Sequence, residues 1–453
     1  MKQREALEIL KTGENIFLTG SAGSGKTFLL NQYIEYLKEN KINISITAST
    51  GIAATHLNGR TIHSWSGIGI NEELTKAQMK ALKDRDYLIS RILSSKVLII
   101  DEISMLNAKR LDLVDNICKV FRQDLRPFGG MQVVFCGDFF QLPPVAKDKE
   151  DNRFVTESEI WNDMNMKICY LDEQHRQEDK RFLRVLNDIR KDSTNEETIG
   201  ILKERHNKSV KSNIKPTKLY THNIDVDAIN EAELAKLEGD ELVYDMYSEG
   251  TPYLIKNLKG NYCLVPEKLR LKIDAIVMFL KNNFSEGYVN GTLGKVIGFD
   301  ENSNYPIVET FSGKQIIAER EKWIMEDGNK VVASINQVPL RLAWAITVHK
   351  SQGMSLDCAE IDLSKTFEYG MGYVALSRVR SLAGIKLLGI NDLSLKVNKE
   401  AGALDKHFIS KSKEDLNEYK KIGKKEINKK QNRFLEENKD NDVDYDNILG
   451  LPF

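Results

Sequence analysis

The stretch Gly20-Ser21-Ala22-Gly23-Ser24-Gly25-Lys26-Thr27 decides the fold class of this chain. It fits the pattern G-x-x-x-x-G-K-[ST], follows an apolar strand-like run at 16–18 and opens a helical stretch at 27–38. Glycines in such a loop let backbone N–H groups close on phosphates, and the start of the helix favours their negative charge. The stretch therefore predicts a nucleotide-binding loop in which Lys26 reaches the β- and γ-phosphates and Thr27 offers its hydroxyl to Mg²⁺.

Two later strand ends carry side chains that suit nucleotide hydrolysis. The apolar run 97–100 ends in Asp101, suited to the metal shell, and Glu102, suited to orienting and deprotonating an attacking water. The run 133–136 leads to Gln141, which could contact the γ-phosphate and relay its loss to a neighbouring domain. Acidic strand ends and loop amides are commonplace, so it is the phosphate loop in the same chain that favours the catalytic interpretation.

Strand-like and helical runs alternate along the chain in two separate sets. Short apolar runs occur at 16–18, 42–47, 97–100, 133–136 and 168–171, and again at 218–220, 360–363 and 385–388. Buried strands separated by helices predict parallel sheets, and a length of 453 residues suits two or three domains. We therefore expect an α/β fold with two sheet domains.

Changes in composition give the expected domain boundaries. The first domain would span 1–172 with a polar helical insertion at about 66–91, and the second would combine 173–253 with 336–410. Alternating hydrophobicity and turn signals predict a small β insertion at 254–335. Lys, Glu, Asp and Asn dominate residues 411–453, which predicts a solvated helix followed by a flexible tail.

Composition excludes several classes of protein. Hydrophobic residues make up 41% and charged residues 29%, as in ordinary globular proteins, and no apolar run approaches the length of a membrane span. Without a secretion signal, the expected location is the cytoplasm. The 5 cysteines are too far apart in sequence for a disulfide framework or a zinc motif, so we interpret them as small core residues. A net charge of −1 means that any nucleic-acid binding must be local.

Further motifs run in a fixed order along residues 1–395. They are Thr-Ala-Ser-Thr-Gly-Ile-Ala-Ala at 47–54, Gly-Arg-Thr-Ile-His-Ser-Trp at 59–65, Gly-Asp-Phe-Phe-Gln-Leu-Pro-Pro-Val at 137–145, Leu-Asp-Glu-Gln-His-Arg-Gln at 171–177, Asn-Gly-Thr-Leu-Gly-Lys-Val at 290–296, Ala-Ile-Thr-Val-His-Lys-Ser-Gln-Gly-Met-Ser at 345–355 and Tyr-Val-Ala-Leu-Ser-Arg-Val-Arg at 373–380. Together with the phosphate loop and the Asp-Glu-Ile-Ser box at 101–104, this series closely resembles the Pif-type DNA helicases of the RecD-like branch, superfamily 1B.

The resemblance implies an architecture and a set of ligands. It implies two RecA-like P-loop NTPase domains with ATP and Mg²⁺ in the cleft, a short wedge insertion in the first domain and a small β-barrel insertion in the second. Single-stranded DNA would cross the top of both domains. Arg176 and Arg378 fall where the family has arginine fingers, which stabilise the transition state of phosphoryl transfer. A surface ion pair is the alternative for each of them.

The resemblance also assigns individual contacts. Gln3 matches an adenine-reading glutamine, although a solvated side chain is the alternative for it. The nucleotide contacts would include Gly20, Gly23, Ser24, Gly25 and Gly353, and the DNA contacts Thr50, Gly51, His63, Ser64, Thr347, His349 and Ser351. For His63 and His349 the alternative is a satisfied buried histidine, and Trp65 is more simply a core residue than a base-stacking one.

The leading hypothesis is an ATP-dependent DNA helicase that moves 5′ to 3′ in replication, repair or recombination. It would act on single-stranded, 5′-tailed or forked DNA, near the nucleoid of a bacterium or in a phage-like setting. One alternative is a translocase on single-stranded DNA that does not open duplexes. The other is a P-loop remodelling ATPase that is indifferent to DNA.

The tail suggests a further partner. Residues 420–433 are basic and are expected to be mobile, an acidic stretch follows, and the chain ends in Leu451-Pro452-Phe453. Acids before a terminal Pro-Phe resemble the C-terminal tip of bacterial single-stranded-DNA-binding proteins, which implies docking to a replication partner. An inert solubilising tail is the alternative.

Overall fold

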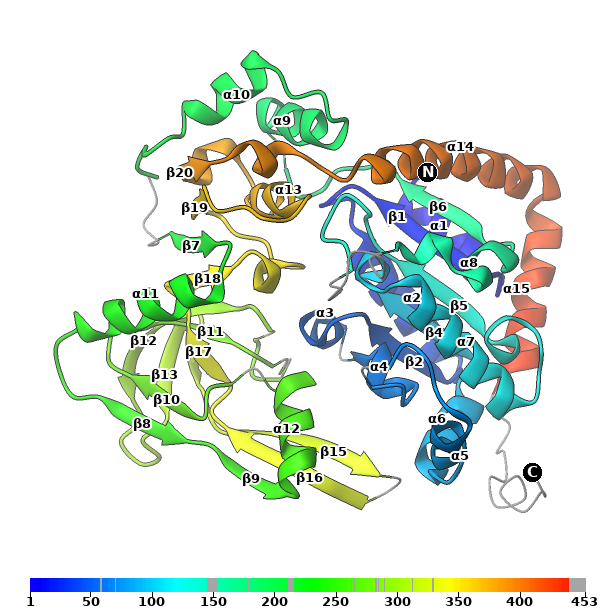
Figure 1. The fold of residues 1–453 in the computed structure, drawn as a ribbon, viewed down its shortest axis with the longest axis horizontal. Coiled ribbons are helices and arrows are strands. Elements are labelled where there is room, and N and C mark those ends of the chain that lie inside the picture. The colour runs from blue at the N-terminus through cyan, green and yellow to red at the C-terminus, as the bar shows by residue number, and fades with distance from the viewer. Residues whose placement is uncertain are drawn as a thin grey trace.

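The computed structural model describes most of the chain. The described residues are 1–439 except 58, 70, 145–152, 178, 211–215, 262, 264, 282, 284, 289, 312, 328 and 329. Within them, helices and strands form two parallel sheets, three antiparallel sheets and a pair of C-terminal helices (Figure 1). None of the helices in this part of the chain is long and apolar enough to cross a membrane.

The first sheet has six parallel strands in the order β3-β2-β4-β5-β1-β6. The strands are β1 (Ile16–Gly20), β2 (Ile44–Ala48), β3 (Arg60–Thr61), β4 (Val97–Asp101), β5 (Gln132–Cys136) and β6 (Lys167–Leu171). The helices of this region are α1 (Gln3–Leu10), α2 (Lys26–Glu39), α3 (Gly51–His56), α4 (Ile62–Trp65), α5 (Lys76–Lys83), α6 (Asp86–Ser94), α7 (Ala108–Arg122) and α8 (Glu159–Asp163).

Helices on both faces explain why the strands of this sheet are apolar throughout. Successive strand residues point to opposite faces, so Phe17 joins one core cluster while Ile16 and Leu18 join the other. Trp65 is 1% exposed and donates from Nε1 to Ser45 Oγ at 2.7 Å, which confirms its interpretation as a core residue. The five cysteines are buried too, as expected.

The second sheet has four parallel strands in the order β18-β7-β19-β20. Its strands are β7 (Thr217–Tyr220), β18 (Ala345–Thr347), β19 (Ala359–Leu363) and β20 (Ile385–Ile390). The helices around it are α9 (Lys180–Arg190), α10 (Glu196–Lys203), α11 (Asn223–Ala235) and α13 (Met371–Ser377). The expected α/β class with two parallel-sheet domains is confirmed.

An antiparallel region lies between β7 and β18 in sequence. A five-stranded sheet runs β14-β13-β12-β11-β17, beside a three-stranded sheet β15-β16-β9 and the pair β10-β8. The strands are β8 (Leu242–Asp245), β9 (Tyr247–Gly250), β10 (Lys268–Leu271), β11 (Ile276–Phe279), β12 (Leu293–Phe299), β13 (Pro306–Thr310), β14 (Gln315–Ile317), β15 (Glu321–Asp327), β16 (Lys330–Gln337) and β17 (Leu340–Leu342), with one helix, α12 (Pro252–Asn261). Because β8 pairs with β10 and β9 with β16, this region begins earlier than the expected residue 254.

The helix expected from residue 411 is present, but the structure continues the helical segment to residue 438 and packs it on the first domain instead of leaving it solvated. Two helices, α14 (Lys399–Ile422) and α15 (Lys424–Asn438), cross from the second domain to the first and descend along its outer side (Figure 1). Phe434 of α15 is 7% exposed and packs against Gly13, and Lys430 pairs with Glu14 at 2.9 Å. The acidic stretch begins within α15 at Glu436 and Glu437, and its remainder at 440–446 and the Pro452-Phe453 tip lie outside the described residues.

Edge protection explains why α14 docks where it does. Strand β6 is at the edge of the first sheet, and an edge strand leaves backbone N–H groups without sheet partners. Ile168 N donates to Asp415 Oδ2 at 2.9 Å, and Tyr170 N donates to Ser412 Oγ at 3.0 Å. The helix therefore completes the hydrogen bonding of β6 with side chains that composition alone marked as solvated.

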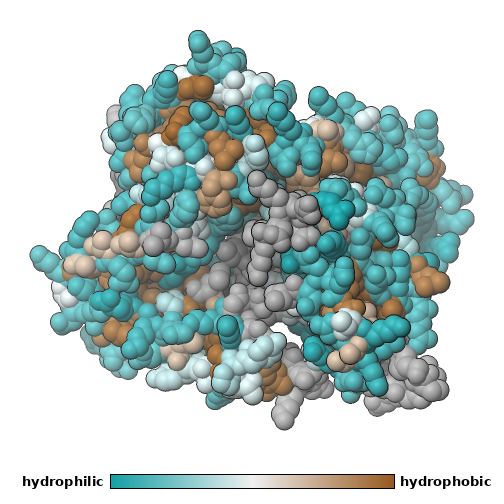
Figure 2. All heavy atoms as spheres, in the orientation of Figure 1, coloured by the Kyte–Doolittle hydropathy of each residue, from teal (hydrophilic) through white to brown (hydrophobic). Residues whose placement is uncertain are grey.

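The visible surface is mostly hydrophilic on both halves of the molecule, with hydrophobic residues interspersed (Figure 2). The segment 66–91, expected to be helical, contains α5 and most of α6. Thr75 caps α5 by accepting from Gln78 N, and the Gln78 side chain bonds back to Thr75 N. This reciprocal cap fixes the start of a short helix that would otherwise be marginal.

Candidate functional site

Strand order brings the predicted chemical groups to one edge of the first sheet. Strands β4, β5, β1 and β6 are neighbours and all parallel, so the loops that follow their carboxyl ends meet. Those loops contain the phosphate loop after β1, Asp101 and Glu102 after β4, Gln141 after β5, and Arg176 after β6. Residues far apart in sequence therefore form one site.

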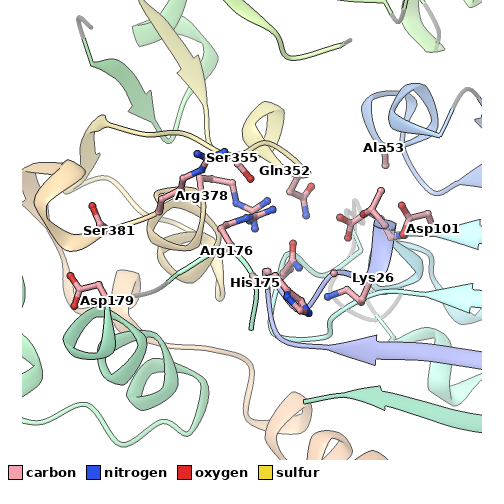
Figure 3. A pocket seen from close by; sticks show the side chains of 18 residues that line it. Lys26, Ala53, Asp101, His175, Arg176, Asp179, Gln352, Ser355, Arg378 and Ser381 are labelled. Atoms are coloured by element: carbon pink, nitrogen blue, oxygen red, sulfur yellow. The ribbon is translucent and has the colours of Figure 1, made fainter. Parts of the chain in front are cut away.

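A cleft of about 810 Å³ lies at this edge, between the two sheet domains. In Figure 3, Lys26 and Asp101 are on one side of it, and Arg176, Arg378 and Gln352 are on the other. It is lined by Ala22, Gly23, Gly25, Lys26, Thr27, Ala53, Asp101, Glu102, Gln141, His175, Arg176, Asp179, Gln352, Gly353, Ser355, Arg378, Arg380 and Ser381. Ten of the residues that the sequence predicts to bind nucleotide or metal or to act in catalysis therefore line one cleft.

The phosphate loop has the conformation that its glycines predict. Gly25 has φ of 84°, in the left-handed region, and the helix α2 begins directly after it. Lys26 folds back over the loop and donates to Gly20 O at 2.8 Å and Ser21 O at 3.1 Å. Its ammonium group is therefore held at the mouth of the loop, where phosphates would sit.

The two carboxylates after β4 lie in different environments. Asp101 Oδ1 accepts from Glu102 N at 2.8 Å, whereas Glu102 Oε2 is buried and has no hydrogen-bond partner among the residues that the structure describes. Burial and the charge of Asp101 raise the pKa of Glu102 to about 7, against the opposing charges of Lys26 and Arg378. A partly desolvated carboxylate of this kind is a stronger base than an ordinary surface glutamate.

Several buried polar atoms around the cleft have no partner among the described residues. They are Ser24 Oγ, Glu102 Oε2, Gln141 Oε1 and Gln352 Nε2. An unsatisfied buried polar group costs about 1–3 kcal/mol, so such groups are rare unless a ligand or water satisfies them. Their concentration here indicates a site shaped for a polar ligand.

The two candidate arginine fingers lie on the opposite wall. Arg378 is 2% exposed and donates to Val374 O at 3.0 Å and Ser377 Oγ at 2.9 Å. Arg176 donates to Ser377 O at 3.1 Å, and burial together with the charge of Arg378 lowers its pKa. Neither guanidinium forms an ion pair with a residue that the structure describes. Two adjacent cations without a carboxylate partner suit a polyanionic ligand.

Three expected nucleotide contacts, Gln3, Gly20 and Ser24, do not line the cleft. Gln3 donates from Nε2 to Ser24 O at 3.3 Å and Gly25 O at 3.4 Å. In this position Gln3 supports the backbone of the phosphate loop. Its expected contact with adenine stays a prediction.

The expected DNA contacts of the first domain lie around α3 and α4. Thr50 and Gly51 precede or open α3, and Thr50 Oγ1 accepts from Ala53 N at 3.3 Å. His63 and Ser64 are half-buried on α4. Burial and the charge of Arg110 lower the pKa of His63 to about 4, so its ring is neutral at pH 7 and would act as a hydrogen-bonding group rather than a cation.

The expected DNA contacts of the second domain follow β18. Thr347 and Ser351 are buried, and Ser351 Oγ donates to Val348 O at 2.7 Å within its own turn. Their hydroxyls therefore shape the turn that carries His349. His349 is half-buried, and burial lowers its pKa.

An aromatic cluster beside His349 has no counterpart in the sequence-based expectations. The ring of Phe367 is 53% exposed and lies 4.9 Å from the ring of His222 and 6.3 Å from that of His349. The three residues follow β19, β7 and β18, which are neighbours in the second sheet. An exposed ring supported by two others is the kind of surface on which nucleobases stack.

Known proteins match the chain along nearly its whole length. Residues 2–199 match the family described as PIF1-like helicase, and residues 254–299 match the 2B domain of DNA helicase Pif1. The curated "ATP-dependent DNA helicase Pif1" of Psychrobacter sp. is 46% identical over 96% of this chain and 75% of its own length. The chain belongs to the PIF1-like helicase family. It spans a smaller share, 62%, of the Danio rerio relative named ATP-dependent DNA helicase PIF1.

Solved structures of the PIF1-like family support the same conclusion for the fold. The Pif1 helicase of Candida albicans superposes with a TM-score of 0.79 at 35% identity, covering 89% of this chain and 98% of that one. A Bacteroides Pif1 in complex with ADP-AlF3 and ssDNA gives a TM-score of 0.66 at 30% identity, covering 91% and 97%. The two sheet domains are therefore RecA-like domains of the PIF1-like type.

Sequence reasoning about this PIF1-like chain missed several residues of the cleft. They are Ala22, Ala53, His175, Asp179, Gln352, Ser355, Arg380 and Ser381. His175 precedes Arg176, and Gln352 precedes Gly353, so adjacency to a predicted residue was the available signal for both. Asp179, Arg380 and Ser381 reach the cleft only because the second domain packs against the first.

The cleft fits the metal that PIF1-like proteins are expected to use. Thr27 and Asp101 both line it, and a hydroxyl with a carboxylate is the hard oxygen donor set that Mg²⁺ prefers. The described residues contain no cluster of three or more His, Cys, Asp or Glu that could hold a metal by itself. A Mg²⁺ site completed by phosphate oxygens and water needs no such cluster.

Proposed function

We propose that this chain is an ATP-dependent DNA helicase that moves 5′ to 3′ along single-stranded DNA and unwinds duplexes ahead of it. The observation that supports this most is the composite cleft, in which a phosphate loop and acidic pair from one domain face two buried arginines from the other. A site built from two domains can couple the state of the nucleotide to domain motion. Membership of the PIF1-like family supports DNA as the track.

In the proposed reaction each side chain has a separate task. Lys26 binds the β- and γ-phosphates, while Thr27 and Asp101 would hold Mg²⁺, which neutralises phosphate charge when bound. Glu102 accepts a proton from water as the water oxygen attacks the γ-phosphorus and ADP leaves. Arg176 and Arg378 stabilise the negative charge of the transition state, and Gln141 contacts the γ-phosphate side of the site.

We assign the DNA strand to the loops around α3, α4 and β18. Neutral His63 and His349 would donate or accept hydrogen bonds at phosphates, which positions a strand without reading its sequence. The exposed Phe367 ring offers a stacking surface that tolerates any base. Thr50, Gly51 and Ser64 would contact the strand from the first domain.

A forked-substrate assay tests this proposal. We expect the protein with ATP and Mg²⁺ to unwind a duplex with a 5′ single-stranded tail and not one with only a 3′ tail, and oligo-dT to stimulate its ATPase. Glu102→Gln is the matched control, which should bind the same fork without opening it. Unwinding from a 3′ tail alone would overturn the direction.

Two other outcomes of the assay would replace the proposal with one of its alternatives. Stimulation by oligo-dT with no unwinding of either fork would leave a translocase that does not open duplexes. An ATPase that oligo-dT does not stimulate would leave a remodelling enzyme indifferent to DNA. Our proposal places the protein in the cytoplasm, close to the nucleoid, where its substrates arise in replication, repair or recombination. Docking of the Pro452-Phe453 tip to a replication partner remains a separate prediction.

A further inference from the structure

One tyrosine hydroxyl joins the two RecA-like domains directly behind the nucleotide cleft. Tyr373 lies on α13 of the second domain and is 1% exposed. Its hydroxyl accepts from Ala22 N of the phosphate loop at 3.1 Å, across 351 residues of sequence. It also accepts from Arg190 Nη1 at 3.0 Å and donates to Asp138 Oδ2 at 3.5 Å.

These three bonds use the full capacity of the group. A hydroxyl has one donor hydrogen and two acceptor lone pairs, and here each has a buried partner. Burial raises the pKa of Tyr373, so the hydroxyl keeps the proton that faces Asp138. A satisfied network at low local dielectric is stronger and more directional than the same bonds at the surface. The hydroxyl is therefore a fixed point and not an incidental contact.

Two of the three partners of Tyr373 are close in sequence to residues that line the cleft. Ala22 lies within the phosphate loop, four residues before Lys26, and Asp138 lies three residues before Gln141. Arg190 pairs with Asp138 at 2.7 Å and with Asp405 of α14 at 3.1 Å, and its guanidinium lies 4.1 Å above the Phe140 ring. Asp138 keeps Arg190 charged even though burial opposes the charge.

The same helix carries the candidate finger. Arg378 is the C-cap residue of α13, five residues after Tyr373, so displacement of the helix moves both groups. The N-terminal end of α13 packs equally tightly against the first domain. Its N-cap residue, Gly370, is so close to the loop after β5 that an added Cβ atom would lie 2.6 Å from Phe140 O and Gln141 O. The distance from the phosphate loop to Arg378 is thus set by contacts at Gly370 and at Tyr373.

We propose that Tyr373 is a positioning residue for phosphoryl transfer, whose hydroxyl sets α13 against the phosphate loop so that Arg378 reaches the transferring phosphate. The inference rests on the proposed role of Arg378. It assigns Tyr373 no contact with ATP, water or DNA. Its effect must therefore appear in turnover and not in the binding of either ligand.

Tyr373→Phe tests the proposal because it removes the hydroxyl and keeps the buried ring. We expect the DNA-stimulated kcat for ATP to fall about 10- to 100-fold, the range that a misplacement of about 1 Å in a catalytic group produces. The KM for ATP and the Kd for oligo-dT should stay within about twofold of the parent values, since the binding groups are intact. A kcat equal to that of the parent would overturn the proposal.

Tyr33→Phe is the matched control. Tyr33 is also a fully buried tyrosine, and its hydroxyl donates to Gln132 Oε1 at 2.6 Å within the first domain, away from the cleft. It should lose thermal stability as Tyr373→Phe does and yet keep its kcat. Equal losses of kcat in both variants would show a general effect of deleting a buried hydroxyl, and would also overturn the proposal.

A double-mutant cycle with Arg378→Ala separates this inference from the function on which it rests. If Tyr373 acts through Arg378, adding Tyr373→Phe to Arg378→Ala should reduce kcat less than twofold further. Fully multiplicative losses would overturn the positioning role while leaving Arg378 catalytic. An unchanged kcat in Arg378→Ala alone would instead contradict the finger, and with it the basis of this inference.

Discussion

At the scale of single residues, burial decides what each charged group of the cleft can do. Glu102 and Arg378 face the same space from different domains, and no carboxylate–guanidinium bond joins them among the described contacts. Arg378 is buried, and Glu102 is half-buried with its Oε2 atom out of solvent. At the surface, water would solvate and screen both charges, and the two side chains would form an ion pair with each other. Here both charges are available to a ligand, and two substitutions test this directly.

Replacing Glu102 with Gln should separate binding from turnover. The amide keeps the shape of the side chain but cannot accept a proton from water, so ATP and DNA affinity should persist while kcat falls by about 10²–10⁴. Filter binding of labelled ATP and a steady-state ATPase assay measure the two quantities. Turnover near the parent rate would show that another group is the base.

Replacing Arg378 with Ala should reduce kcat by about 10³ or more and affect nucleotide affinity far less, because a finger acts mainly on transition-state charge. Arg176 gives the comparison within the same wall, since it donates to Ser377 O while Arg378 donates to Ser377 Oγ. Single-turnover rates with a fluorescent phosphate sensor would measure the loss. A parent-like rate would return Arg378 to a structural role.

At the scale of elements, the C-terminal helices are part of the first domain's surface. Side chains of α14 accept hydrogen bonds from backbone N–H groups on the open edge of β6. On α15, Phe434 packs against Gly13 and Lys430 pairs with Glu14. Composition marked this segment as solvated because lysines and glutamates dominate it. The few apolar residues at helical spacing decide its position, since they are the ones that are buried.

Phe434→Ala should therefore release α15 from the first domain. Truncating a buried phenylalanine costs about 3 kcal/mol, more than a short helix can supply by itself. Hydrogen–deuterium exchange should show amides of 424–438 protected in the parent and fast in the variant. Lys429→Ala, at a side chain that is 77% exposed, is the control and should leave protection unchanged. Fast exchange in the parent would mean that α15 does not dock.

At the scale of the whole molecule, binding of a DNA strand has to be local, because 65 basic residues are balanced by 66 acidic ones. The candidate contacts lie on loops of both RecA-like domains, so a change in domain separation would change their spacing along the strand. A positively charged side chain that binds a phosphate releases a counterion from the DNA, whereas a neutral histidine that binds a phosphate releases none. Affinity and its salt dependence therefore report on different residues.

We expect the Kd for oligo-dT to rise with salt concentration. In a plot of log Kd against log salt concentration the rise should be linear, with a slope of about 0.7 for each phosphate that the protein neutralises. His349→Ala should weaken binding about fivefold, the value of one hydrogen bond of about 1 kcal/mol, and leave the slope unchanged. Fluorescence anisotropy between low and high salt measures both. A slope reduced by about 0.7 in the variant would show instead that the His349 ring is protonated in the complex.

The sequence by itself determined the features that short stretches encode. A phosphate loop, an acidic strand end and an apolar strand each depend on neighbouring residues, because backbone conformation and hydrogen bonding there are local. The strands at 97–100, 133–136 and 168–171, and the loops that follow them, were predicted correctly to within one residue at each end. The order of motifs also indicated the family.

Only the tertiary structure decided which of these local features meet. The bond from Ala22 to Tyr373 spans 351 residues, and Phe434 reaches Gly13 from the other end of the chain. Such contacts depend on how two sheets pack and on which edge strand needs covering, and no spacing in the sequence encodes either. The burial that gives Glu102 a raised pKa and hides the hydroxyls of Thr347 and Ser351 arises in the same way. It depends on every element packed around them, so the folded chain alone determines it.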